Sequence, residues 1–115
     1  MRIGGDYLVA IWGGEKPHIG AIAAAQPRPS LKKPESTSAT ASVICFPAHK
    51  EHEIVRLVSE KLAAALNANV VVTAGIHWDN ISKDSIEKVV RNTEILTGLI
   101  LTAASRLLKD SNGEL

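Results

Sequence analysis

The run NVVVTAGI at residues 69–76 constrains the fold more than any other segment. It is almost continuously apolar and has turn-forming residues on both sides, a pattern typical of a strand whose two faces are both covered. His77, Trp78 and Asp79 follow where this strand ends. We therefore expect one buried strand within a sheet, with a polar and aromatic cluster at its end.

Three further strands are predicted before it. Residues 6–14, 18–26 and 40–46 are rich in apolar residues and are interrupted by glycine or proline, which favours strands joined in a short antiparallel meander. Residues 27–38 hold three of the five prolines and are predicted to be a flexible loop. This loop is either a simple hairpin connection or a peptide-like segment that a partner orders.

The segment 49–67 is predicted to be an amphipathic helix that lies on the sheet. Its apolar residues recur at three- and four-residue spacing, while charged residues, Glu51 among them, mostly occupy the other side. Asn67 suits the helix exit because asparagine tolerates the left-handed conformation that a C-terminal cap needs.

A second helix is predicted from Ser82, whose hydroxyl can cap a free backbone N–H. Ile95, Leu99, Leu101 and Leu108 widen its apolar stripe to more than half of the circumference. Such a helix needs a second surface to bury against, which a partner chain provides most easily in so small a domain. We therefore expect the interface of a homodimer, or of another partner, on this helix.

The predicted order is β-β-β-α-β-α, an α/β chain of the α+β two-layer sandwich type. It has a mixed four-stranded sheet with two helices on one face. At 115 residues the chain is expected to be a single domain, 1–115, with a frayed tail at 109–115.

Composition narrows the classes of partner. A net charge of +1 gives no basis for binding nucleic acid or an anionic membrane, and no apolar run approaches the roughly 18 residues that span a bilayer. Because aromatic residues make up 3% of the chain, aliphatic residues and alanine must fill the core, which favours a core shared in a homodimer. The single cysteine, Cys45, is interpreted as core filler in a cytoplasmic protein.

The strand directions bring three loops to one edge of the sheet. In the predicted topology the first, third and fourth strands run the same way. The loops that follow them carry all four histidines, His18, His49, His52 and His77. Open α/β sheets commonly bind ligands at such an edge.

Metal binding and acid–base catalysis are two hypotheses for this edge. His49 and His52, with His77 and Asp79, offer metal ligands without an accompanying thiolate pair. His77 with Asp79, or His49 with Glu53, offers an imidazole and a carboxylate for proton transfer. No nucleophile elbow accompanies them.

Anion or phosphate binding is the third hypothesis. The start of the first helix presents free N–H groups beside His49 and Lys50, and the neighbouring glycine pair allows close backbone approach. No P-loop or dinucleotide-binding motif is present. The candidate binding residues are Gly13, Gly14, His49, Lys50, His77, Trp78, Asp79 and Asn80.

The motifs PAHKEHE and VVVTAGIHWDNISKDSIEKVV resemble those of the LpdD-like family. This family includes the D subunit of gallate and vanillate decarboxylases, which are associated with enzymes that use prenylated flavin. It is similar in topology to the proteasome-assembly chaperones, which are homodimers of β-β-β-α-β-α units. The resemblance covers residues 6–101, and the motif positions are His49, Lys50, His77, Asp79 and Asn80.

The resemblance implies a non-catalytic accessory or chaperone-like protein. Such a protein would assist a partner decarboxylase or its cofactor, prenylated FMN or FMN. The alternative function is a small enzyme that binds a phosphate ligand or a metal through the histidines of the edge. The proline-rich segment 27–38 is longer than the compact family pattern needs. The resemblance therefore does not specify which surface faces the partner.

Overall fold

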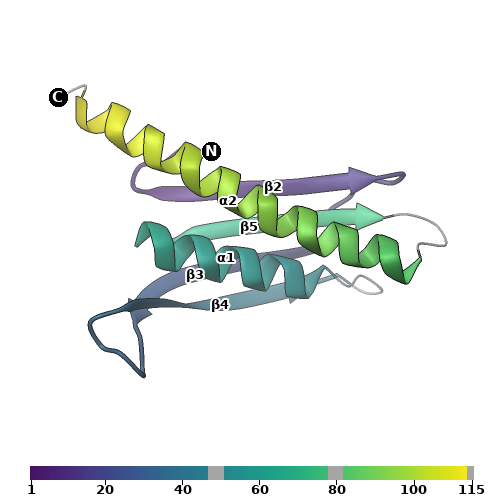
Figure 1. The fold of residues 1–115 in the computed structure, drawn as a ribbon, viewed down its shortest axis with the longest axis horizontal. Helices are drawn as coiled ribbons and strands as arrows, with labels where there is room; N and C mark the ends of the chain where they lie inside the picture. Colours follow the sequence, from purple (N-terminus) through teal and green to yellow (C-terminus); the bar gives the residue numbers. More distant parts are fainter. Residues whose placement is uncertain (47–50, 78–81, 114–115) are drawn as a thin grey trace.

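The computed structural model describes residues 1–46, 51–77 and 82–113 and has two layers, a mixed five-stranded sheet and two helices over one of its faces (Figure 1). This confirms the predicted fold class. The sequence predicted four strands. The additional strand, β1, has two residues, too few to produce a periodic pattern. The elements are β1 (Arg2–Ile3), β2 (Asp6–Gly14), β3 (Ala21–Pro29), β4 (Thr37–Cys45), α1 (His52–Leu66), β5 (Val70–His77) and α2 (Lys83–Gly113).

β5 lies between β2 and β3, in a sheet of order β1-β2-β5-β3-β4. It pairs parallel with β2 and antiparallel with β3, so the predicted meander through the first two long strands is wrong. The physical reason is the apolar run of β5. Val70 and Val72 are fully buried, as is usual for an inner strand that has a neighbour on each side.

The strand directions were nevertheless predicted correctly. β3 is antiparallel to both β4 and β5, so β2, β4 and β5 run the same way. Their C-terminal ends meet at one edge of the sheet, on the right in Figure 1. We call this the ligand edge, and it is bounded by Gly14, Cys45 and His77, the last residues of these three strands.

The connection from β2 to β3, residues 15–20, must cross the end of β5. It is held there by the Gly20 N–H, which donates to the Ala74 carbonyl at 2.9 Å. Gly75 makes the crossing feasible because a Cβ atom at this position would collide with the His18 carbonyl. The glycine near the end of β5 is therefore explained by a close approach of backbone to backbone.

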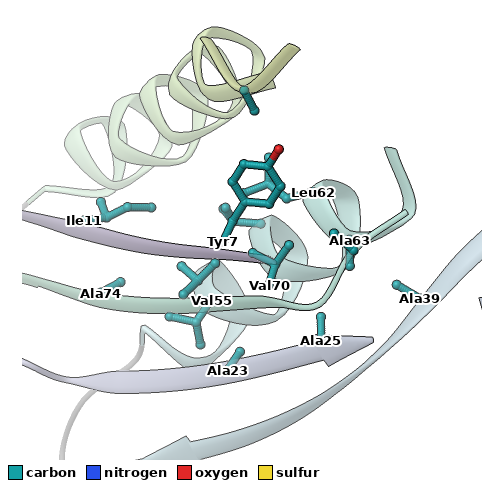
Figure 2. Close-up of a cluster of buried hydrophobic side chains, with 14 of the residues drawn as sticks. Tyr7, Ile11, Ala23, Ala25, Ala39, Val55, Leu62, Ala63, Val70 and Ala74 are labelled. Carbon is teal, nitrogen blue, oxygen red and sulfur yellow. The ribbon is translucent and has the colours of Figure 1, made fainter. Parts of the chain in front are cut away.

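The core lies between the sheet and the helical layer, mainly beneath α1 and with Ala104 of α2 at its side (Figure 2). Small side chains on β3, such as Ala21 and Ala23, are fully buried beneath Val55 and Leu62 of α1. Alanine at these positions lets the helix approach the sheet closely, so aliphatic groups fill the core. Tyr7 is the aromatic member of the cluster.

Both predicted caps are confirmed. Asn67 ends α1 in the left-handed conformation, with φ 48°, and its N–H donates to the Ala63 carbonyl. Ser82 precedes α2 and accepts a hydrogen bond from the Ser85 N–H at 3.2 Å. In the part of the chain that the structure describes, neither helix combines the length and apolar character needed to cross a membrane.

The proline-rich hairpin is more regular than predicted. β3 continues through Pro29 and β4 begins at Thr37, so the connection is 30–36 rather than 27–38. Proline is tolerated in this part of β3 because the pairing with β5 ends at Ala25, after which one side of the strand is an open edge. The flexibility of the loop stays a prediction.

Two further segments differ in position from their predictions. Cys45 is exposed rather than buried in the core, because β4 is an edge strand and its last residues have a neighbouring strand on one side only. The helical backbone of α2 continues to Gly113, through most of the predicted tail at 109–115. Fraying of that tail stays a prediction.

Gly14 and Gly13 form a matched pair for testing the crossing. Gly14 has φ +81°, and a Cβ atom there would collide with the His77 carbonyl, whereas a Cβ atom on Gly13 meets nothing within 4 Å. We expect Gly14→Ala to lower the free energy of unfolding by about 2 kcal/mol. Gly13→Ala is expected to change it by less than about 1 kcal/mol.

Urea denaturation followed by circular dichroism measures both changes. Equal stability of the two variants would contradict the tight crossing at the end of β5.

Candidate functional site

The ligand edge brings together the strand-borne residues that the sequence singled out. Gly13 pairs with Ile76 and Gly14 with His77 in the parallel register of β2 and β5, so the glycine pair and His77 lie side by side. The starts of α1 and α2 lie at the same edge (Figure 1). The other candidate residues, His49, Lys50, Trp78, Asp79 and Asn80, lie outside the described residues, and their placement stays a prediction.

His18 is brought to His77 by the connection that crosses β5. The two imidazole rings lie edge to face, with centroids 6.3 Å apart and planes at 76°. The Nδ1 atom of His18 is 2.8 Å from the Lys16 carbonyl. Because a carbonyl can only accept, Nδ1 carries the hydrogen and donates it, which directs the Nε2 atom elsewhere.

That Nε2 atom lies 3.2 Å from the Oε1 atom of Glu51. Glu51 is 6% exposed, and its Oε1 atom also accepts a hydrogen bond from the Ile76 N–H at 3.2 Å. This contact brings an imidazole nitrogen of the crossing connection against a buried carboxylate oxygen. Glu51 thus ties the start of α1 to both β5 and the crossing connection.

The interpretation of Glu51 as a solvent-facing helix residue is wrong. It rested on a helix starting near His49, but α1 begins at His52, so Glu51 precedes the helix and turns toward the sheet. Gly20 is the sequence signal for this position of Glu51. Gly20 leaves room for the carboxylate, because a Cβ atom there would stand 2.5 Å from the Glu51 Oε2 atom.

The first turn of α1 carries an exposed ion pair. Arg56 donates to Glu53 at 3.0 Å. This hydrogen bond, and then the charge of Arg56, holds the pKa of Glu53 below its ordinary value. Glu53 in turn raises the pKa of Arg56. Glu53 is therefore engaged on its own helix, and the pairing of His49 with Glu53 stays a prediction because His49 is outside the described residues.

The metal hypothesis receives no geometric support from the described ranges. Within residues 1–46, 51–77 and 82–113, no group of three or more histidine, cysteine, aspartate or glutamate side chains is arranged to hold a metal ion. The predicted set depended on His49 and Asp79, so the hypothesis stays untested.

The chemistry that the described residues favour is recognition of an anion. The N-termini of two helices lie at one edge, and the first N–H groups of a helix have no acceptor within the helix itself. His77 supplies an imidazole that can donate a hydrogen bond, and Gly14 keeps the strand end free of side chains. The buried carboxylate of Glu51 contacts His18 and the Ile76 amide through its Oε1 atom, while its Oε2 atom has no hydrogen-bond partner among the described residues.

The chain was compared with known proteins. A family model described as the prenylated flavin chaperone LpdD-like domain matches residues 1–105. Protein LpdD of Lactiplantibacillus plantarum (strain ATCC BAA-793 / NCIMB 8826 / WCFS1) is similar, with 27% identity over 105 residues, covering 87% of this chain and 70% of that protein. These similarities confirm the expected family.

Removal of the Glu51 side chain tests its role at the ligand edge. Glu51→Ala leaves the partly buried Ile76 N–H without its acceptor, and we expect a loss of about 1 kcal/mol in the free energy of unfolding. Glu51→Gln keeps an oxygen for Ile76 and should lose less. Hydrogen exchange of the Ile76 amide, which should quicken in Glu51→Ala, reports the local effect. Unchanged exchange in that variant would contradict the proposed tie.

Proposed function

Because the chain belongs to the prenylated flavin chaperone LpdD-like family, we propose that it is a non-catalytic, cytoplasmic accessory protein. In this proposal it holds prenylated FMN, or FMN, at the ligand edge and assists a decarboxylase that uses the prenylated cofactor. It acts as a homodimer. The observation that carries the proposal is the shared edge at which Gly14, His77 and two helix starts meet.

The phosphate of a flavin mononucleotide suits this edge. It is a compact dianion, and helix N-termini stabilise such groups through free N–H donors and the helix dipole. A histidine donor adds a hydrogen bond to a charged acceptor, which is stronger than one between neutral groups. The family match and the geometry therefore support the same class of ligand.

The exposed side of α2 supports docking of a partner protein. Ile95 and Leu99 lie one turn apart and are 63% and 62% exposed. The buried side of the same helix carries smaller groups, including Thr93, Thr97 and Ala104. Large apolar side chains that face outward on one helix are typical of a protein interface. We assign this surface to the partner decarboxylase.

Flavin binding tests the cofactor part of the proposal. We expect FMN to bind, and His77→Ala to weaken its affinity about 10- to 100-fold, the equivalent of one hydrogen bond to a charged group. Riboflavin, which lacks the phosphate, should bind more weakly than FMN. Isothermal titration calorimetry with FMN and prenylated FMN measures these differences.

Lys61→Ala is the control, because Lys61 is an exposed basic residue in the later part of α1, away from the ligand edge. Its affinity for flavin should stay within about twofold of the unmodified chain. Absence of binding by both flavins to the folded protein would contradict the cofactor role. Equal affinity for FMN and riboflavin would contradict phosphate recognition.

Co-purification tests the partner. Co-expressed with the prenylated-flavin-dependent decarboxylase of its host, the chain should recover that enzyme in a pulldown. Leu99→Glu should reduce recovery at least about tenfold, because a charge placed in an apolar interface core is desolvated without a partner. Ala65→Glu, at an exposed site of α1, should leave recovery unchanged. Failure of the unmodified chain to recover the enzyme would contradict this part of the proposal.

A further inference from the structure

The face of the sheet opposite the helices is apolar. Along β2, Tyr7 and Ile11 point into the helical layer and are buried, whereas the alternate residues Leu8 and Trp12 are 36% and 68% exposed. Alternation along a strand directs these two sets to opposite faces. Both helices lie on the first face (Figure 1), so Leu8 and Trp12 belong to the second.

The same apolar character continues across the sheet. Ile22 on β3 pairs with Ile44 on β4 and Thr73 on β5, and Ile44 is 65% exposed. Ala24 pairs with Val71 of β5 in the next outward row. We define the outer sheet face by Leu8, Ala10, Trp12, Ile22, Ala24 and Ile44.

None of these defining side chains is charged. Two hydroxyl groups lie among them, because Thr73 pairs with Ile22 and Ser42 pairs with Ala24, and charged groups lie at the margin. Arg28, beyond the last β5 pairing, donates from Nε to the Thr40 hydroxyl at 2.6 Å. Asp6, at the start of β2, accepts from the Asn69 N–H at 3.0 Å. An apolar centre within a polar rim is the usual anatomy of a protein interface.

The outer sheet face is a better candidate for self-association than α2. Exposed charged residues, including Arg91 and Glu94, lie close to Ile95 on that helix, and burying charges between two identical helices carries a desolvation penalty. The sheet face avoids this penalty. Its small residues Ala10 and Ala24 also lie beside large ones, which permits interdigitation of two sheets.

The area of the outer sheet face is of the order that a small dimer interface needs. Four long strands about 4.8 Å apart, each up to nine residues long with a rise of about 3.3 Å, project onto roughly 500 Å². Protruding side chains such as Trp12 increase the accessible area beyond this projection. A standard interface uses about 800 Å² of accessible surface on each partner, so the whole face, with its protruding side chains, would be needed.

We propose that two copies of this chain pair sheet on sheet through the outer sheet face. This inference rests on the homodimer proposed above and names its interface. It leaves α2 on the outside of each copy, where a partner enzyme can reach Ile95 and Leu99. An isologous contact of this kind closes after two copies.

Ala24→Glu is the decisive variant. Ala24 is exposed and lies on β3, which has strands on both sides, so the new charge disturbs face packing rather than an edge. Sedimentation velocity at concentrations up to about 100 µM should show a dimer for the unmodified chain. Ala24→Glu should raise the dimer dissociation constant at least about 100-fold. Ala65→Glu, the same change on an exposed alanine of α1, and Leu99→Glu should remain dimeric.

Ile44→Lys is the second variant, for use if Ala24→Glu lowers the melting temperature. Loss of the dimer in a folded Ile44→Lys protein supports the proposal when Leu99→Glu stays dimeric. If the Ala24→Glu protein is folded and still dimeric, the sheet-on-sheet interface is overturned, but the homodimer is not. The dimer then forms through the β4 edge if only Ile44→Lys is monomeric. It forms through α2 if Leu99→Glu is monomeric. If the unmodified chain is monomeric, both the proposed interface and the proposed homodimer are overturned. The cofactor role is tested separately by flavin binding, so this result leaves it standing.

Discussion

The hydrogen bonding of β5 to both β2 and β3 is the constraint from which the rest of the structure follows. A strand that is apolar on both faces is most stable as an inner strand, and here it separates two strands that are neighbours in sequence. The connection between them then has to pass the end of β5. Gly75 permits that passage, and His18 is carried by it to within 6.3 Å of His77, measured between ring centroids.

Much of the fold could be predicted because local signals were strong. The strands, the caps at Asn67 and Ser82, and the shared direction of β2, β4 and β5 follow from periodicity and turn chemistry. The strand order could not be predicted in the same way, because a hydrophobic pattern shows which faces are buried but does not specify which strand lies alongside. Cys45 was misplaced for the same reason, since the edge position of β4 depends on that order.

The candidate site also has one part that could be predicted from the sequence and one part that could not. That Gly13, Gly14 and His77 share one edge depends on strand direction and could be predicted, whereas their side-by-side pairing depends on β2 lying next to β5 and could not. Glu51 could not, because its partners are a backbone amide 25 residues away and a histidine on the crossing connection. Its burial depends on α1 beginning at His52, and a boundary shift of three residues turns a helix-surface side chain toward the sheet.

The pairing of β2 with β5 also governs when the N-terminal part of the protein can become native. Asp6 and Asn69 are joined across 63 residues, so during synthesis β2 waits until more than half of the chain has left the ribosome. Through that interval the segment around Leu8 and Trp12 lacks β5 beside it. A member of a chaperone family thus carries, ahead of its central strand, a partly apolar strand whose pairing is incomplete until β5 has been made.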